Sequence, residues 1–201
     1  VLAEGASPEE ARELLQADVD EIRRRLGTIV FGEGDDTLEA VVARMLVDRH
    51  KTIATAESCS GGLLAKRLTD ISGSSAYFLR GYVPYADAAK VELVGVPADL
   101  ISRHGAVSEP VAEAMAIGCR RAAGSDYALS ITGIAGPSGG SPPEKPVGLV
   151  YIGLAHSAGV ETLRVLCGDH LTRDEIRDRS CKTALNLSRL HLAGVRSSPQ
   201  N

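Results

Sequence analysis

Hydrophobic positions repeat with two different periods along the chain. Near the N-terminus, Leu15, Val19, Ile22 and Leu26 follow one another at spacings of four, three and four, the period of one apolar helix face. The preceding segment Ser7-Pro8-Glu9-Glu10 supplies a capping hydroxyl, a proline and an acidic first turn, which are typical of a helix start. We therefore predict an amphipathic helix in this region.

A polar, glycine-containing stretch at residues 32–36 separates this helix from a second one predicted from about Thr37 to Arg49. Because the apolar stripe of the first helix must pack on something, we interpret the N-terminal region as a linker or adaptor. The predicted organisation is a helical linker at residues 1–36, a main domain at 37–193 and a polar tail at 194–201.

From residue 51 the pattern alternates between short apolar runs and helical segments. The last two apolar runs are joined by Ser157-Ala158-Gly159 and predict a hairpin, and Thr172 with Glu175 forms a capping box. This order predicts a three-layer α/β/α sandwich with a mixed, mostly parallel sheet. The predicted strands are 52–56, 76–83, 127–132, 148–156 and 160–167, and the predicted helices are 60–69, 86–94, 98–104, 108–123 and 172–192.

The amino-acid composition argues against some classes of binding partner. The 201 residues are 44% hydrophobic and 24% charged, which is ordinary for a globular domain. Lysine and arginine total 22 against 26 acidic residues, and the aromatic residues are five Tyr and two Phe, so the sequence favours neither a phosphate-tracking surface nor base stacking. No apolar run approaches the roughly 18 residues that span a bilayer. We expect no nucleic-acid or membrane partner.

The four cysteines, at positions 59, 119, 167 and 181, form no Cys-x-x-Cys pair and have no suitably spaced histidines. This pattern argues against a zinc site and fits reduced thiols, so we expect a cytoplasmic location. The first thirty residues also lack the order of a signal peptide. Because the chain begins with Val1 and not methionine, we expect further sequence upstream in the natural protein.

Candidate chemistry begins in the segment Thr55-Ala56-Glu57-Ser58-Cys59-Ser60-Gly61-Gly62, which joins a predicted strand to a predicted helix. The first N–H groups of a helix lack partners and carry partial positive charge, so they stabilise an anion. A serine in this turn is a candidate nucleophile. The alternative is that Ser60 is only an N-cap and that the glycines form a tight turn.

A second segment places Tyr85 and Lys90 about one and a half helical turns apart, just after a predicted strand. Only five of the 22 basic residues are lysines, and lysine, unlike arginine, can lose its proton. Lys90 is a candidate base if burial and a nearby cation favour its neutral form. The alternative is a solvated helix residue, with Tyr85 at the edge of the core.

The third segment runs from Thr132 to Gly140 and continues to Lys145-Pro146-Val147-Gly148. Four glycines within eight residues expose backbone N–H groups and permit close approach of a phosphate. The segment is not a Walker motif and lacks the dinucleotide fingerprint. It could equally be a simple connection between two strands.

These segments, together with Gly73-Ser74-Ser75-Ala76, Arg80-Gly81-Tyr82 and His104-Gly105-Ala106-Val107-Ser108, resemble the C-terminal domain of the CinA family, whose stand-alone members are nicotinamide-nucleotide amidases. The likeness covers about Leu38 to Leu192. Residues 22–42 resemble the linker that precedes this domain in longer CinA proteins, which carry a molybdopterin-binding-like N-terminal domain.

The resemblance implies that the carboxamide of nicotinamide mononucleotide is hydrolysed to nicotinate mononucleotide and ammonia, without metal or cofactor. It implies Ser58 as nucleophile, Lys90 as general base and Tyr85 as proton relay or orienting hydroxyl. We expect the substrate to be a small-molecule nucleotide and the assembly to be a homodimer. The expected oxyanion and substrate-binding residues are Ser60, Gly61, Gly62, Ser74, Ser75, Arg80, Thr132, Gly133, Gly136, Gly139 and Gly140.

The chain departs from the family pattern around the proposed base. Pro84 and Ala86-Asp87-Ala88 replace the usual residues, and the carboxylate of Asp87 favours the ammonium form of a neighbouring lysine. His170-Leu171-Thr172 is inserted before Arg173 and shifts a possible ligand contact. These changes leave open a catalytically decayed nucleotide-binding or oligomerisation module. A third alternative makes Cys59 the nucleophile, since a helix N-terminus can lower a thiol pKa.

Overall fold

The computed structural model describes residues 2–139 and 145–195, which divide into two compact units, one ending at Asp36 and one beginning at Thr37. The first unit holds helix α1 (Pro8–Leu26) and a 3-10 turn, η1 (Gly27–Ile29). As predicted, the Ser7 hydroxyl caps α1 by accepting the Glu10 N–H at 3.2 Å. No side chain of α1 is buried among the described residues, so this helix gains little from packing.

The second unit contains helices and strands in the predicted order. The capping box of Thr172 and Glu175 is confirmed at the start of the last helix. The largest difference from the predicted boundaries is at α3, which begins at Leu63 and not at residue 60. The reason is that Gly61 and Gly62 form a turn with φ values of 62° and 94°. The elements are α2 (Leu38–Asp48), β1 (Ile53–Glu57), α3 (Leu63–Thr69), η2 (Ser74–Ala76), β2 (Phe78–Tyr82), α4 (Asp87–Val94), α5 (Ala98–His104), α6 (Glu109–Ala123), β3 (Tyr127–Gly133), β4 (Leu149–His156), β5 (Gly159–Leu166) and α7 (Arg173–Leu192).

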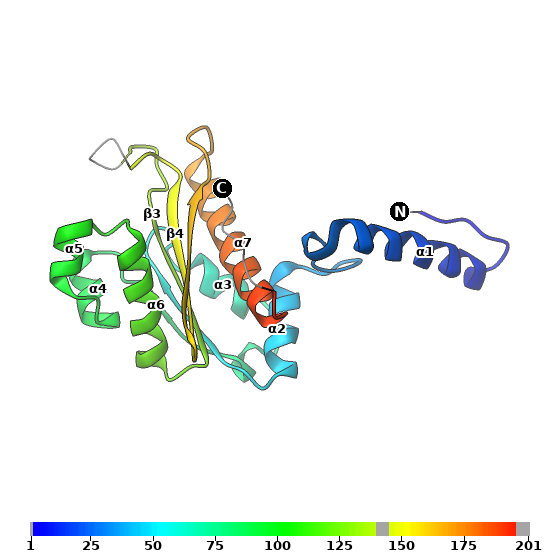
Figure 1. The fold of residues 1–201 in the computed structure, drawn as a ribbon, viewed down its shortest axis with the longest axis horizontal. Helices are drawn as coiled ribbons and strands as arrows, with labels where there is room; N and C mark the ends of the chain where they lie inside the picture. The colour runs from blue at the N-terminus through cyan, green and yellow to red at the C-terminus, as the bar shows by residue number, and fades with distance from the viewer. Residues whose placement is uncertain (1, 140–144, 196–201) are drawn as a thin grey trace. The chain divides into compact units, whose positions relative to one another are not determined.

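The five strands form one mixed sheet in the order β2-β1-β3-β4-β5. Strands β2, β1 and β3 are parallel, whereas β4 pairs antiparallel with both β3 and β5. The three-layer mixed architecture and the hairpin are confirmed (Figure 1). Four of the five strands run in the same direction, and β4 is the one that runs against its neighbours. This agrees with the predicted mixed, mostly parallel sheet.

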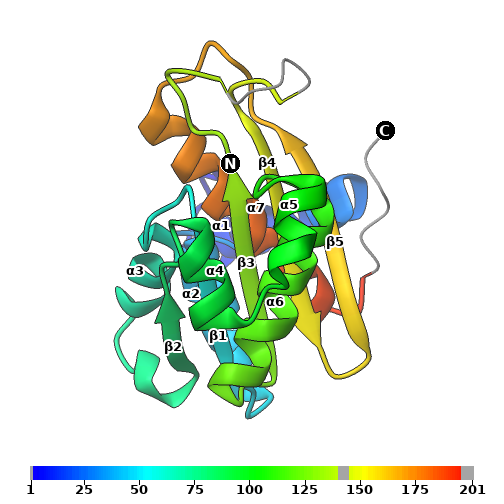
Figure 2. The same cartoon turned by 90° about the vertical axis from the view of Figure 1, so that its left-hand side faces the viewer.

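Helices α2, α3 and α7 cover one face of the sheet, and α4, α5 and α6 cover the other (Figure 2). Side-chain size differs between the faces. Ile53, Leu129 and Ile131 face the first layer, whereas Ala54 and Ala128 face the second. Small residues let α6 approach the sheet closely, and each fully buried large aliphatic side chain stabilises the fold by about 1.5–3 kcal/mol.

The chain crosses from β1 to β2 through α3 on one face, and from β2 to β3 through α4, α5 and α6 on the other. The strand order therefore reverses between β1 and β3. In α/β sheets, ligands bind outside the carboxyl ends of the strands at such a reversal. We call this side of the sheet, where Glu57, Tyr82 and Gly133 end their strands, the carboxyl edge. No described helix has the length and hydropathy of a membrane span.

Candidate active site

Ser58 directly follows the last residue of β1 at the carboxyl edge. Its N–H donates to the Ile131 carbonyl at 2.9 Å, which extends the pairing with β3 and fixes the start of the turn. Ser58 is 8% exposed. Its hydroxyl makes no hydrogen bond to any described residue, so it is available to a ligand.

Glu57 caps helix α3 and is fully buried. Its Oε2 accepts the N–H groups of Gly62 at 3.1 Å and Leu64 at 2.9 Å, and its Oε1 accepts that of Ala65 at 2.7 Å. A carboxylate here satisfies orphan donors and complements the positive end of the helix dipole. The capping alternative for Ser60 is therefore wrong. The sequence signal was an acidic residue at the strand end, just before the Ser58–Gly62 turn.

The structure corrects the oxyanion donors expected at Gly61 and Gly62. The Gly61 N–H donates to the Ser58 carbonyl at 3.1 Å, and the Gly62 N–H donates to Glu57. By contrast, the N–H groups of Cys59 and Ser60 have no acceptor on any other described residue. The buried Ser60 hydroxyl also lacks a partner within the described chain. Unpaired donors immediately after a serine match the arrangement in which the residue following the nucleophile helps to form an oxyanion hole.

Lys90 is buried, with 1% of its surface exposed. Its Nζ donates to the Tyr85 carbonyl at 2.9 Å and lies 3.4 Å from Oδ1 of Asp87. The alternative of a solvated helix residue is therefore wrong. The Asp87 side chain is 61% exposed, so water screens its attraction for the ammonium group. Among the described residues, no hydrogen bond joins Lys90 to the Ser58 hydroxyl.

Tyr85 is more exposed than the other two proposed catalytic residues, at 57%. Its hydroxyl accepts a hydrogen bond from Arg173 at 3.0 Å, while its carbonyl accepts from Lys90. Tyr85 thus positions Lys90 through its backbone. Its hydroxyl is directed to Arg173, and no hydrogen bond links that hydroxyl to Ser58 or Lys90 in the described structure.

Two arginines, one turn apart at the start of α7, connect the loops of the carboxyl edge. Arg173 donates to the Gly136 carbonyl at 2.7 Å as well as to Tyr85. Arg177 donates twice to the Ser60 carbonyl, at 3.1 and 2.8 Å. The turn after β1 and the loops after β2 and β3 therefore share one end of α7. The residues inserted before Arg173 do not remove it from this region.

Gly136 and the neighbouring loops also gather at this edge. Gly136 has a φ of 75°, which favours glycine, and Gly139 is exposed. Lys145 Nζ donates to the His104 carbonyl at 2.7 Å, which brings another family-like segment to the site. The expected contact at Gly140 lies outside the described residues.

Thr132 and Gly133 have packing roles that differ from the predicted substrate contacts. Thr132 is fully buried, and its hydroxyl donates to the Ala106 carbonyl at 2.8 Å. A Cβ at Gly133 would lie 2.8 Å from the Leu149 carbonyl oxygen, so glycine allows β4 to approach. The Thr132 hydroxyl is already hydrogen-bonded, and the space beside the Gly133 Cα is already occupied by β4. Both residues therefore shape the edge.

Ser74, Ser75 and Arg80 lie away from Ser58. The two serines precede β2, which begins opposite Ile53 at the amino end of β1. Arg80 pairs with Ala54, about 13 Å along the strand from the serine turn. Its guanidinium donates to the Ala122 carbonyl at the C-terminal end of α6. Within one chain these three residues do not lie beside Ser58, because motif order does not place residues at the same strand end.

Cys59 does not meet the requirements for a nucleophile. Burial raises the pKa of its thiol to about 12, because desolvation of the thiolate outweighs the favourable helix-terminal field. Cys59 packs within the core beneath α7. The structure thus argues against the thiol alternative, and all four cysteines are unbridged.

Two cavities lie outside this cluster. One, of about 390 Å³, is lined in part by Arg44, Ser72 and Tyr77. The other, of about 610 Å³, contains His156, Glu161 and His191 and is discussed below. Neither includes Ser58 or Lys90. The case for the carboxyl edge therefore depends on the N–H groups of Cys59 and Ser60, which have no acceptor on another described residue, and on the buried Lys90 amine. Cavity volume does not identify this edge, because both cavities lie elsewhere.

Comparison with known proteins points to one family. Residues 35–192 match the sequence model for the CinA C-terminal domain. A CinA-like protein from Geobacter sulfurreducens is 50% identical over 192 residues, covering 94% of this chain and 45% of that protein. A CinA-like protein from Citrifermentans bemidjiense is 47% identical over 186 residues, covering 92% and 44%. The chain thus spans a little under half the length of these curated relatives.

Solved structures agree with this assignment. A competence-damaged protein (CinA) superfamily member from Klebsiella pneumoniae has a TM-score of 0.75 and 32% identity, covering 78% of this chain and 96% of that chain. The competence/damage inducible protein CihA from Agrobacterium tumefaciens has a TM-score of 0.72 and 38% identity, covering 81% and 99%.

Proposed function

This chain belongs to the family of CinA C-terminal domains, and we propose that it hydrolyses the carboxamide of nicotinamide mononucleotide to nicotinate mononucleotide and ammonia. The observation that carries the proposal is the pair of N–H groups at Cys59 and Ser60, which have no acceptor on another described residue and directly follow a serine at the carboxyl edge. Such donors stabilise the oxyanion of acyl transfer, and one of them is typically worth about a hundredfold or more in rate.

Ser58 supplies the nucleophile in this mechanism. Its Oγ bonds to the carboxamide carbon while neutral Lys90 accepts the hydroxyl proton, and the carbonyl π electrons move to oxygen. The N–H groups of Cys59 and Ser60 bind that oxyanion. When the tetrahedral intermediate collapses, the C–N bond breaks and the Lys90 ammonium protonates the departing nitrogen, which leaves as ammonia.

Water completes the cycle. Lys90 takes a proton from water as its oxygen attacks the Ser58 ester, and the same amine returns the proton to Ser58 Oγ when the ester bond breaks. Nicotinate mononucleotide is released and the enzyme is restored. Apo catalytic contacts are often long and tighten when substrate binds, so substrate must bring the carboxamide and Ser58 within reach of Lys90.

Arg173 is suited to the phosphate of the nucleotide. Its guanidinium pairs with no carboxylate in the described part of the chain, and its known partners are the neutral Tyr85 hydroxyl and Gly136 carbonyl. Arginine presents five donors in a planar fork that matches phosphate oxygens. In this proposal Tyr85 orients Arg173 and supports Lys90 through its carbonyl. Its hydroxyl can act as a relay only after leaving Arg173.

A second candidate function is nucleotide binding without turnover. It is favoured by Asp87, whose Oδ1 lies 3.4 Å from Lys90 Nζ and stabilises the ammonium form. A protonated amine cannot accept the Ser58 proton. Measurable substrate binding without ammonia release would support this alternative, whereas turnover that depends on Ser58 would eliminate it.

The direct experiment measures ammonia release from nicotinamide mononucleotide, with nicotinamide and its riboside as controls for phosphate recognition. Ser58→Ala and Lys90→Arg should each abolish measurable turnover. Ser74→Ala and Lys66→Arg are matched controls, because Ser74 lies at the opposite edge and Lys66 forms an exposed pair with Asp70. Unchanged turnover in Ser58→Ala would refute the proposed nucleophile.

The unbridged cysteines fit a reducing compartment, and we place the reaction in the cytoplasm. We also propose a homodimer as the working assembly. Sedimentation of the purified chain at several concentrations tests that assembly separately from its chemistry.

A further inference from the structure

A cluster of metal-ligating side chains lies at the opposite edge of the sheet from Ser58. His156 ends β4, Glu161 lies near the start of β5, and His191 is in the last turn of α7. Because β4 is antiparallel to β3, its end lies beside the amino end of β3, where Ala155 pairs with Ala128. The cluster is therefore separate from the proposed amidase residues.

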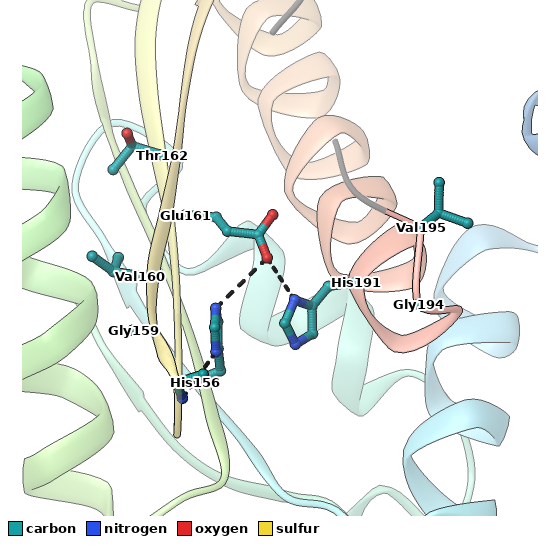
Figure 3. A pocket seen from close by; sticks show the side chains of 9 residues that line it. His156, Gly159, Val160, Glu161, Thr162, His191, Gly194 and Val195 are labelled. Atoms are coloured by element: carbon teal, nitrogen blue, oxygen red, sulfur yellow. Dashed lines mark hydrogen bonds and ion pairs between the residues drawn. The ribbon is translucent and has the colours of Figure 1, made fainter. Parts of the chain in front are cut away.

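The three side chains converge on one point (Figure 3). Glu161 Oε1 lies 2.5 Å from His191 Nδ1 and 3.6 Å from His156 Nε2. One ligand atom from each residue lies within 4.8 Å of the other two. Zinc bonds of about 2.0–2.1 Å in a tetrahedral site place ligand atoms roughly 3.3–3.4 Å apart. Changes of at most about 1.5 Å in the separations between ligand atoms would therefore give a coordination shell.

The surroundings hold the rings near this geometry. The two imidazole centroids are 4.3 Å apart, and the Tyr127 ring meets the His191 ring edge-on at 5.4 Å. All three ligand side chains are partly buried, with exposures between 14% and 29%. They line a cavity of about 610 Å³, which leaves room for a solvent ligand.

The charge balance also suits a divalent cation. Burial, followed by the influence of His191, lowers the pKa of His156, and Arg120 acts in the same direction while Glu161 opposes it. A neutral imidazole is the form that ligates metals, and a ring nitrogen of each histidine already lies close to the Glu161 carboxylate. The Glu161 carboxylate supplies negative charge, and Arg120 is the nearby cation that weakens binding.

We propose that His156, Glu161 and His191 bind one transition-metal ion of the zinc class, with a fourth position open to water in the cavity. Two imidazoles and one carboxylate form a ligand set that zinc uses when one position remains open, and imidazole also suits nickel and copper. The ion would tie the β4–β5 hairpin to the end of α7. It takes no part in the proposed amide hydrolysis.

Binding requires a proton rearrangement at His156. Its Nδ1 now accepts the Ala158 N–H at 3.2 Å, which places the ring proton on Nε2. Coordination through Nε2 moves that proton to Nδ1 and gives up the Ala158 contact. The ion also replaces the hydrogen bond between His191 and Glu161. Both changes weaken affinity, because the ion must displace contacts that the ligand side chains already make.

The test is calorimetric titration of Zn²⁺ into the full chain after chelator treatment and removal of the chelator. We expect one ion per chain, with at least tenfold weaker binding in Glu161→Gln and in His191→Ala. His50→Asn is the matched control, because His50 is exposed and has a φ of 52° that asparagine tolerates. Its affinity should equal that of the unmodified chain.

Two further measurements distinguish loss of the metal site from misfolding of a variant. Zn²⁺ should raise the melting temperature of the unmodified chain but not that of Glu161→Gln, and Co²⁺ should give the visible absorption of a low-coordinate site only when all three ligands are present. Absence of saturable one-to-one binding in the unmodified chain would overturn the proposal. So would equal binding by folded Glu161→Gln and His191→Ala.

Discussion

The two edges of the sheet hold polar groups in different ways. At the carboxyl edge, Glu57, Arg173 and Arg177 direct most of their hydrogen bonds to backbone groups of the surrounding turns. At the opposite edge, His156, Glu161 and His191 interact mainly with one another through their side chains. The first arrangement fixes loop positions around Ser58, the proposed nucleophile, and the second creates a compact donor set.

The comparison shows that a candidate site can be recognised in two ways. One is a motif that is continuous in the sequence, and the other is a cluster of side chains that only the fold brings together. The carboxyl-edge turn is continuous in sequence from Glu57 to Gly62, so its chemistry can be proposed before the fold is known. The three residues of the opposite cluster are spread over β4, β5 and α7, and only folding brings them together.

The largest expected effect is the loss of turnover when the proposed nucleophile at the carboxyl edge is removed. Ser58→Ala should lower kcat by at least a thousandfold, because loss of a nucleophile in a cooperating set removes most of its catalysis. Ammonia release measures the loss, and Ser74→Ala should retain normal turnover. The same Ser58→Ala protein should bind Zn²⁺ normally if the two edges act independently.

Removing the charge of Arg173 should have the next largest effect. In Arg173→Met, KM for nicotinamide mononucleotide should rise by about 10–100-fold, since a charge-assisted phosphate contact is worth about 1.5–3 kcal/mol. Initial-rate measurements with the mononucleotide and the riboside distinguish phosphate recognition from general damage. An equal loss with both substrates would assign Arg173 a structural role instead.

Substitution of Glu57 should test the stability of the serine turn. Glu57→Ala leaves the N–H groups of Gly62, Leu64 and Ala65 without their acceptor, so the free energy of unfolding should fall by about 3 kcal/mol. Urea denaturation measures the change. Glu92→Ala, at an exposed position of α4, should change stability by less than about 0.5 kcal/mol.

A smaller effect is expected from Asp87→Asn. The substitution removes the carboxylate 3.4 Å from Lys90 Nζ, which favours the neutral amine, so turnover near pH 7 should increase several-fold. Initial rates of ammonia release near pH 7 measure this increase. Asp70→Asn provides a control, because Asp70 pairs with the distant Lys66. A fall in activity would indicate that Asp87 is needed to position the amine.

The smallest effect concerns pH and stability at the opposite edge. The pKa of folded His156 is lowered, chiefly by burial, from an ordinary value of about 6.5. The unfolded chain therefore binds more protons in this range, and stability falls as pH drops through about 6.5. Metal-free unfolding curves between pH 5 and 8 should show a shallower decline in His156→Gln. Glu161, His191 and Arg120 also influence the pKa of His156, so the comparison must keep them unchanged.

Sequence patterns predicted most of the fold because apolar runs mark the strands and because α1, α2 and α7 begin with side-chain caps. The exception at α3 is instructive, since Gly61 and Gly62 postpone the helix and Glu57 supplies its cap from the preceding strand. Periodicity and capping patterns describe one helix or strand at a time. They therefore do not predict that the carboxylate of Glu57, at the end of β1, accepts N–H groups at the start of α3.

The candidate site was only partly predictable for a related reason. Ser58 and Lys90 stand in recognisable segments, whereas the importance of Arg177 depends on α7 reaching the Ser60 carbonyl. Conversely, Ser74 and Arg80 belong to family-like segments but lie elsewhere on the sheet. Their position follows from strand direction and side-chain direction, which a list of motifs does not contain.

The cap formed by Glu57 has an electrostatic consequence for selectivity. Because an acidic group already compensates the positive terminus of α3, that terminus offers little attraction to a distant anion. Under the proposed function, recognition of a charged nucleotide tail would then rely on guanidinium groups of α7, apart from the proposed bond-breaking centre. Added salt should consequently weaken capture of the substrate while leaving the rate of the bound complex nearly constant.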